Sequence, residues 1–243
     1  LPSAGAAVGL GAIWKFPYLA GSNGGSAFLF PYLVLSFTIG LTLVIAEITL
    51  GRLGKGGIVT AYRTIAGKGW TVFGYLGILT GFCVLCFYSA IGGWTISYFI
   101  DALLGNGIVT DVSELNAHFG ALVSNPYISI GYQAAFLFLT AWVVLFDVAK
   151  GIERLNKILM PLLFVLVLVL IVRGVTLPGA EKGIAYLFAW KPETFTWQSL
   201  LAAMGFTFFS LCVGCGCMLT YGSYLSKDTN LLTGCSWITF LAT

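Results

Sequence analysis

Charge is scarce in this chain, and histidine is nearly absent. Only 9% of the 243 residues are Asp, Glu, Lys or Arg, whereas 58% are hydrophobic and the mean hydropathy is +0.95. This composition excludes an ordinary soluble domain. The one histidine, His118, has no visible catalytic partner in the sequence, so we expect no enzymatic activity.

Long apolar segments occupy most of the chain. The clearest begins at Ala27 and ends at Leu50, contains Glu47 as its one charge, and is long enough to cross about 30 Å of hydrocarbon at about 1.5 Å per residue. Similar segments are Val72–Ile100, Ile130–Phe146, Leu155–Val172 and Trp197–Tyr221. The sequence therefore predicts an all-α, polytopic transmembrane helical bundle.

Both ends of the sequence lie inside apolar segments. No methionine starts the chain, few residues precede Val8, and the apolar run Leu231–Thr243 is shorter than the about 20 residues that span a bilayer. We expect a fragment that begins within its first span and stops within its seventh, without a signal peptide.

The charged residues are segregated between loops. Segments Gly51–Trp70 and Asp147–Lys157 are rich in Lys and Arg, whereas Asp101–Ile130 contains acids and neither Lys nor Arg. The positive-inside rule then places the first two segments in the cytoplasm and the third outside.

The connections between spans have distinct expected structures. We expect Gly21–Ser26 to be a short turn, Ile58–Ile65 a helix on the membrane surface, and Asp101–Ser129 the longest outside loop. Segment Pro178–Trp197 is expected to contain a re-entrant or surface helix. Pro161 is expected in the first turns of the fifth span, where a proline is tolerated or kinks the helix.

Two glycine pairs interrupt apolar spans, at Val8–Gly11 near one end of the chain and at Val213–Gly216 near the other. Glycine is a poor helix former, so each pair favours local unwinding. Backbone groups freed in this way cannot face lipid and must line a cavity or be buried in protein. The predicted topology makes the two spans antiparallel, and matching breaks of this kind mark the binding site of a transporter.

The first break combines the two ends of helix dipoles. The leading N–H groups of Leu10 to Ala12 would form a positive helix end that suits a carboxylate. The carbonyl groups around Gly5–Val8 would form a negative end that suits a cation. A tightly packed helix crossing through Gly5 and Gly9 is the alternative, and the matching second break favours transport.

Two charged side chains lie within the spans. Glu47 is the one acid deep in a span, and such carboxylates are functional candidates. We expect it to accept hydrogen bonds from backbone freed at a break; an interfacial position and proton coupling are the alternatives. Lys15 follows the first break by one turn and is expected to face a water-filled vestibule and an acidic partner.

The cysteines all fall in apolar spans, which argues against a disulfide framework. They are Cys83, Cys86, Cys212, Cys215, Cys217 and Cys235. The Cys212-x-x-Cys215-x-Cys217 cluster fits small packing or pocket-lining residues better than a soft-metal site.

Two pairs of side chains are spaced to share a helix face. They are Val84 with Tyr88, and Phe209 with Cys212. Ordinary helix packing also accounts for each of them.

Several ordered motifs resemble the neurotransmitter:sodium symporter family, in its bacterial amino-acid transporter branch with the LeuT-type fold. The motifs are Gly5–Tyr18, Asn23-Gly24-Gly25-x-Ala27-Phe28, Glu47-x-x-x-Gly51-Arg52, Lys150–Arg154, Phe208–Leu211 and Thr220–Tyr224. The resemblance covers the whole chain and implies the N-terminal half of an inverted-repeat transporter. Residues 1–243 would form a single transmembrane domain fragment, with the first repeat at about 1–177 and the start of the second at about 197–243.

The resemblance implies a site for an amino acid. The substrate carboxylate would meet the N–H groups of Leu10 and Gly11 and the hydroxyl of Tyr88. Its ammonium would meet carbonyl groups near Ala6, Phe209 and Ser210. Its side chain would be lined by Val84, Phe209, Cys212 and Cys215.

The resemblance also implies gating and structural roles. Phe209 would cap the site from outside, and Lys15 stands where the family usually has the arginine of the outer gate. Tyr224 matches a tyrosine of the inner gate, and Glu47 would support the breaks.

Two sodium sites are typical of the family, but one is altered here. The first would use the carbonyl groups of Gly5 and Val8 and ligands from later spans. The second would retain the Ala7 carbonyl and the Ser210 hydroxyl, while Ala12 replaces an asparagine ligand. We therefore expect one well-formed Na⁺ site. Phe206 replaces the glutamine that chloride-dependent relatives use, so chloride is not expected.

This reasoning predicts sodium-coupled symport of an amino acid by alternating access. Cys215 replaces a larger residue, and the added room favours a hydrophobic or aromatic substrate. Expected partners are that substrate and the lipid bilayer, with no nucleic acid and with a homodimer left open. The expected location is the cell membrane, as in a bacterial inner membrane. A transporter-like amino-acid receptor and a proton-coupled transporter using Glu47 are the alternatives.

Overall fold

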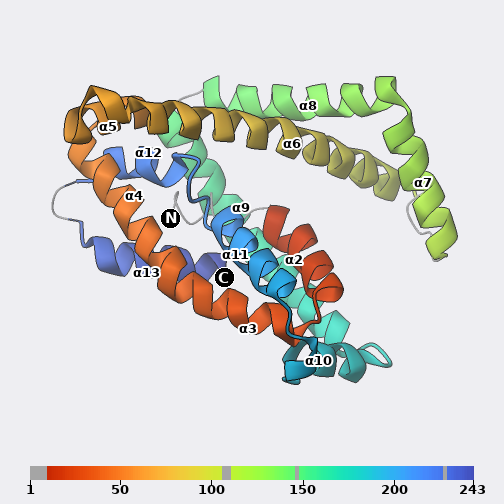
Figure 1. Cartoon of the computed structure of the whole chain (residues 1–243). Coiled ribbons are helices and arrows are strands. Elements are labelled where there is room, and N and C mark those ends of the chain that lie inside the picture. The colour runs from red at the N-terminus through yellow and green to blue at the C-terminus, as the bar shows by residue number, and fades with distance from the viewer. Residues whose placement is uncertain (1–9, 106–110, 146–147, 227–228) are drawn as a thin grey trace. The chain divides into compact units, whose positions relative to one another are not determined.

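The computed structural model describes residues 10–105, 111–145, 148–226 and 229–243, which are helical with short connections and contain no strand (Figure 1). Two compact units are present. One comprises residues 1–80 and 155–243, and the other comprises residues 81–154. The repeat boundaries expected from the sequence remain a prediction.

The first part of the chain contains five α-helices and two short irregular helices within its described residues. They are α2 (Leu10–Ser22), α3 (Ser26–Leu35), the π-helix η1 (Ser36–Gly40), α4 (Leu41–Gly54), α5 (Ile58–Ala66), the 3₁₀ helix η2 (Lys68–Trp70) and α6 (Thr71–Leu103). Helix α6 begins in the first unit and continues into the second.

The rest of the chain continues the helical pattern. Its elements are α7 (Val112–Ser124), α8 (Pro126–Leu145), α9 (Val148–Val175), α10 (Ala180–Phe188), η3 (Pro192–Thr194), α11 (Trp197–Ser210), α12 (Cys217–Ser223) and α13 (Leu231–Ala242).

The apolar segments predicted from the sequence are helices. Four of them are long and apolar enough to cross a membrane, namely Ser26–Gly54, Lys68–Leu103, Pro126–Leu145 and Lys157–Val175. Helix α13 is apolar but shorter. The all-α polytopic architecture is therefore confirmed for the described residues.

Helices α3 and α4 form one span that is interrupted by the π-helix η1. Ser36, at the start of η1, is fully buried, and Gly40 at its end lies against the side chains of Leu211 and Thr207. Single π-turns within α-helices often occur at functional sites. Here the π-turn brings the second span against the end of α11.

Small residues allow α4 and α12 to approach closely, and the two helices lie side by side in Figure 1. A methyl group added at Gly51 would overlap the carbonyl oxygen of Leu219, and one added at Gly222 would overlap the carbonyl oxygen of Ile48. Close backbone contact through glycine is the usual way in which membrane helices pack without a hydrophobic driving force.

Segment Asp101–Ser129, expected to be the longest outside loop, contains α7 and the start of α8, and its location outside the membrane stays a prediction. Asp111 caps α7 by accepting a hydrogen bond from the Ser113 N–H at 3.0 Å. This hydrogen bond lowers the pKa of Asp111. Pro126 occupies the first position of α8, which suits a residue without an N–H group.

Helix α9 begins at Val148, before the apolar span Lys157–Val175 that it contains. Pro161 is the fifth residue of that span, so it lies in the first turns of the span, as expected, and well inside the helix. The helices expected within Gly51–Trp70 and Pro178–Trp197 are present as α5 and α10.

Candidate substrate and ion site

The second glycine break is present between α11 and α12. Helix α11 ends at Ser210, α12 begins at Cys217, and the residues between them form turns and a bend. Gly214 and Gly216 have φ angles of +88° and +76°, in the left-handed region that glycine adopts at little cost. The interruption predicted from the paired glycines is thus confirmed.

Glu47 of α4 binds this break directly. Its Oε1 accepts a hydrogen bond from the Gly214 N–H at 2.7 Å. Its second oxygen, Oε2, is buried and has no hydrogen-bond partner within the described part of the chain. The sequence predicted a carboxylate that accepts hydrogen bonds from freed backbone, and this contact has that form. A charge-assisted bond of this kind is stronger than one between neutral groups.

The first break is only partly within the described residues. Gly5, Ala6, Ala7 and Val8, which carry the expected cation and ammonium ligands, lie outside them. Within the described residues, α2 comprises Leu10–Ser22. The first break, and the positive helix end expected at the N–H groups of Leu10 to Ala12, therefore stay predictions.

Lys15 and Phe209 connect α2 to α11. The Lys15 ammonium lies 4.2 Å from the centre of the Phe209 ring, within the range of a cation–π interaction. Both residues were predicted from the sequence to belong to the outer gate, but the contact between them was not. The acidic partner expected for Lys15 remains a prediction.

An aromatic cluster surrounds the inner face of Phe209. Phe206 is 2% exposed and lies 5.1 Å from Tyr32, 5.9 Å from Phe16 and 5.9 Å from Phe28, measured between ring centres. Phe206 and Phe209 are 6.4 Å apart. Tilted aromatic pairs at these distances are favourable. Phe206 is therefore enclosed by packed aromatic rings.

Ser210 joins three helices. Its hydroxyl donates to the carbonyl oxygen of Ala242 in α13 at 3.1 Å and lies 3.4 Å from the hydroxyl of Tyr32 in α3. The Ser210 proton points to a carbonyl group and the Tyr32 hydroxyl donates to one lone pair of the Ser210 oxygen, so the second lone pair is left to accept. This orientation suits a cation ligand.

The three cysteines of the second break lie close together. The Cys215 thiol donates to the carbonyl oxygen of Cys212 at 3.0 Å and interacts with the thiols of Cys212 and Cys217. Cys212 has a φ angle of +52° and lies outside α11, so the expectation that Phe209 and Cys212 share a helix face is wrong. The break begins earlier than its glycines and ends the helical periodicity. No group of metal-ligating side chains is found in the described residues.

Three further predicted residues lie on α6 or directly after α12. Val84 and Tyr88 lie four residues apart on α6 and are half-buried, but they belong to the second unit. Their participation in a pocket with Phe209 therefore stays a prediction. Tyr224 follows the end of α12 and is 73% exposed.

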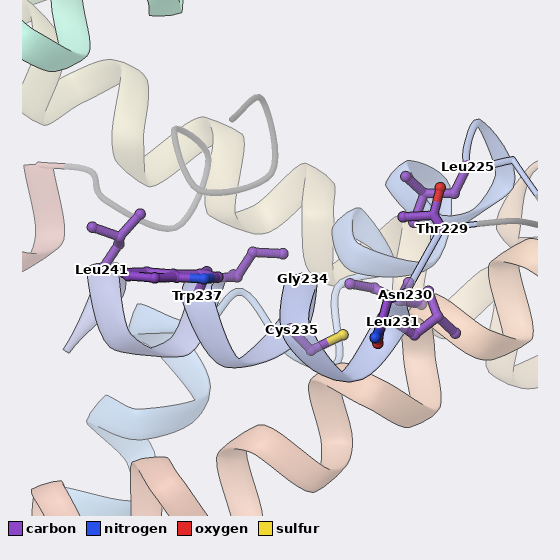
Figure 2. Close-up of a pocket in the computed structure, with 10 residues that line it drawn as sticks. Leu225, Thr229, Asn230, Leu231, Gly234, Cys235, Trp237 and Leu241 are labelled. Carbon is purple, nitrogen blue, oxygen red and sulfur yellow. The ribbon is translucent and has the colours of Figure 1, made fainter.

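A separate apolar cavity of about 450 Å³ lies beside α13 (Figure 2). It is lined by residues of α13, by the connection before it and by Ile48 of α4. None of the predicted substrate residues lines it, so it is distinct from the candidate site.

Sequence reasoning missed part of the site. Tyr32, Phe16 and Phe28 stand out in the structure because they enclose Phe206, whereas in the sequence they are ordinary aromatic residues of apolar spans. The one available signal was their helical spacing, which packing residues share.

The chain is similar to known sodium-dependent transporters. The sequence model of the Sodium:neurotransmitter symporter family matches residues 1–109 and 128–243. A sodium-dependent transporter of Bacillus subtilis, YhdH, is 38% identical over 232 residues, which are 95% of this chain and 51% of the relative. The human sodium- and chloride-dependent GABA transporter 2 is 30% identical over 288 residues, covering 99% of this chain and 46% of the relative.

A solved structure has the same fold. The crystal structure of MhsT in complex with L-phenylalanine matches with a TM-score of 0.93 and 40% identity, over 99% of this chain and 55% of MhsT. The chain thus spans about half the length of the relatives that it matches. These relatives are transporters and not enzymes. With its broken sixth span, its carboxylate-bound break and its matched motifs, the chain belongs to the sodium:neurotransmitter symporter family.

Proposed function

We propose that the full-length protein is a sodium-coupled symporter that imports a hydrophobic or aromatic amino acid by alternating access across a bacterial inner membrane. The observation that carries this proposal is the unwound segment between α11 and α12, held by Glu47 at Gly214. An unwound backbone at membrane depth needs a polar cavity or a protein cover, and it supplies the carbonyl and N–H groups that bind a small zwitterion.

The substrate carboxylate is assigned to the first turn of α2, at Leu10 and Gly11, with Tyr88 as a further donor. The ammonium is assigned to carbonyl groups at Ala6, Phe209 and Ser210. A helix end attracts a carboxylate because its N–H groups and dipole act together.

The substrate side chain is assigned to Val84, Phe209, Cys212 and Cys215. MhsT, whose structure contains L-phenylalanine, supports an aromatic substrate. Cys215→Phe should shift uptake toward smaller amino acids, because the phenyl ring would fill part of the pocket. An unchanged preference among leucine, phenylalanine and tryptophan would show that Cys215 does not line it.

One well-formed sodium site is proposed, at the carbonyl groups of Gly5 and Val8. The second site would depend on the Ala7 carbonyl and the Ser210 hydroxyl, and Ala12 offers no side-chain oxygen. A hard cation prefers several oxygen ligands, so this second site is expected to bind sodium weakly. A sodium titration of uptake should give a Hill coefficient near one; a value near two would contradict this assignment.

Chloride independence is proposed from the packing around Phe206. The ring is buried among Phe16, Phe28 and Tyr32, and the Tyr32 hydroxyl is directed to Ser210, so Phe206 itself offers an anion no donor. Replacing chloride with gluconate should leave uptake unchanged. Uptake that stops in gluconate would overturn the proposal.

The central test uses the full-length protein in proteoliposomes. An inward sodium gradient should drive accumulation of radiolabelled L-phenylalanine, and counterflow should occur without a gradient. A receptor that binds but does not cycle would give no counterflow. Uptake driven by a proton gradient without sodium, and lost in Glu47→Gln, would instead support the proton-coupled alternative.

A further inference from the structure

We propose that Cys212 and Cys215 form a redox-sensitive dithiol, which closes into a disulfide under a peroxide and stops transport. This inference rests on the proposed function, because it assigns a modification to the same pocket. Both cysteines are half-buried and neither is in a disulfide. The Cys215 thiol donates to the carbonyl oxygen of Cys212 at 3.0 Å, which places the Cys215 sulfur beside Cys212.

The interruption of the helix is what allows this pair to close. A disulfide needs the two Cβ atoms about 3.5–4.5 Å apart, whereas side chains three or four residues apart on a regular helix have Cβ atoms about 5–6 Å apart. Cys212 has a φ angle of +52° and follows the last residue of α11. Its backbone is therefore free of the helical spacing that would hold the thiols apart.

The chain contains an internal control with the same spacing. Cys83 and Cys86 are also separated by two residues, are free and exposed, and lie within the continuous helix α6. Because that backbone is regular, the two thiols should resist closing even though they are more accessible. Because both pairs have the same spacing in the sequence, a difference in disulfide formation between them would be due to the helix break.

The chemistry requires a two-electron oxidant, for which hydrogen peroxide is the proposed co-reactant. One thiolate attacks a peroxide oxygen, so that an S–O bond forms, the O–O bond breaks and the departing hydroxide takes up a proton to become water. The second thiol then attacks the resulting sulfenic acid. The S–S bond forms, the S–O bond breaks and a second water leaves. Two thiols are oxidised while one peroxide is reduced to two waters.

Closure would fix the segment that the substrate has to engage. The N–H of Cys212 bonds the Phe209 carbonyl at 3.2 Å, and Glu47 holds Gly214 immediately before Cys215. A covalent bridge from Cys212 to Cys215 would remove the freedom of this turn and take both thiols from the pocket wall. Alternating access requires the two halves of a broken helix to move, so the bridged state should not cycle.

The test uses the full-length protein in proteoliposomes, treated with hydrogen peroxide and then with dithiothreitol. Peptide mapping should find a Cys212–Cys215 disulfide and none between Cys83 and Cys86. Phenylalanine uptake should fall to the level of protein-free liposomes and recover on reduction. Absence of the bridge, or a bridge with undiminished uptake, would overturn the proposal.

Three variants sharpen the assignment. Cys217→Ser should retain both basal uptake and sensitivity to peroxide, whereas Cys212→Ser and Cys215→Ser should form no bridge at this position and resist inhibition relative to their own untreated rates. Loss of sensitivity in Cys217→Ser would refute the pairing. If the untreated protein takes up no phenylalanine, the proposed substrate fails, while the disulfide map still decides whether the dithiol closes.

Discussion

Two sets of helices with similar hydropathy differ in how they are packed. The break region, here α3, η1, α4, α11, α12 and α13, includes the span Ser26–Gly54, in which 28% of the most apolar part is buried. The α7–α8 pair includes the span Pro126–Leu145, which is also strongly apolar and in which none of that part is buried. Hydropathy therefore identifies both as spans but does not show which one builds the site.

The kind of contact differs between the two sets. In the break region, glycines lie against backbone carbonyl groups and Glu47 binds an unwound turn. On α8, Gly131 has open space where a side chain would lie, while Gln133 packs against Gly93 of the regular helix α6 and donates to the Ser89 hydroxyl at 2.8 Å. The family model matches the whole break region but leaves out residues 110–127, which include α7. The family model therefore includes all of the break region, whereas it leaves out α7.

The strongest test of this comparison exchanges glycine for alanine in each set. Gly51→Ala should be destabilising by about 3 kcal/mol, the upper end of typical overpacking, because the new methyl group meets the Leu219 carbonyl. Gly131→Ala should be neutral or slightly stabilising, since alanine is the better helix former. Thermal unfolding of the full-length protein in detergent measures both. Equal melting temperatures would refute the proposed difference in packing.

The second test removes the contact that holds the break. Glu47→Leu deletes a hydrogen bond to a charged group, worth about 1.5–3 kcal/mol, and should abolish uptake with reduced stability. Glu47→Gln keeps an acceptor oxygen for the Gly214 N–H and should be milder in stability. If the leucine variant transports at the wild-type rate, the break does not depend on this carboxylate.

A smaller effect is expected at the outer face of the site. Lys15→Met removes the cation–π contact with Phe209, worth about 0.5–2 kcal/mol, and should weaken phenylalanine uptake by about 2- to 30-fold. Lys15→Arg preserves a cation over the ring and serves as the control. Uptake by the methionine variant equal to that of the arginine variant would show that the charge is not used.

The smallest expected effect is the pH dependence of the Asp111 cap on α7. The pKa of Asp111 is lowered because the charged carboxylate accepts hydrogen bonds from Ser113. Its support of α7 should therefore be complete above the unfolded pKa of about 3.9 and be lost as the pH falls through the lower folded value.

Hydrogen exchange of residues 112–124, corrected for the intrinsic rate, measures this support. Protection should fall below pH about 4 in the wild type, while Asp111→Asn, which keeps an acceptor oxygen without titrating, should not respond. A parallel loss of protection in both proteins would exclude Asp111 as the titrating group.

The sequence by itself determined the spans, the second break and the family. These follow from local properties: apolar length fixes a span, paired glycines weaken a helix, and ordered motifs do not depend on distant contacts. It also identified Glu47, because a lone carboxylate in a span needs a partner.

Only the tertiary structure decided which groups meet. The sequence could not pair Glu47 with Gly214, Lys15 with the Phe209 ring, or Ser210 with Ala242, because each contact joins segments far apart in the chain. Nor could it place Cys212 outside α11, since the helix ends where packing against the π-turn and Glu47 stabilises the unwound backbone. Local propensity locates a break, and the neighbouring helices determine its length and its contacts.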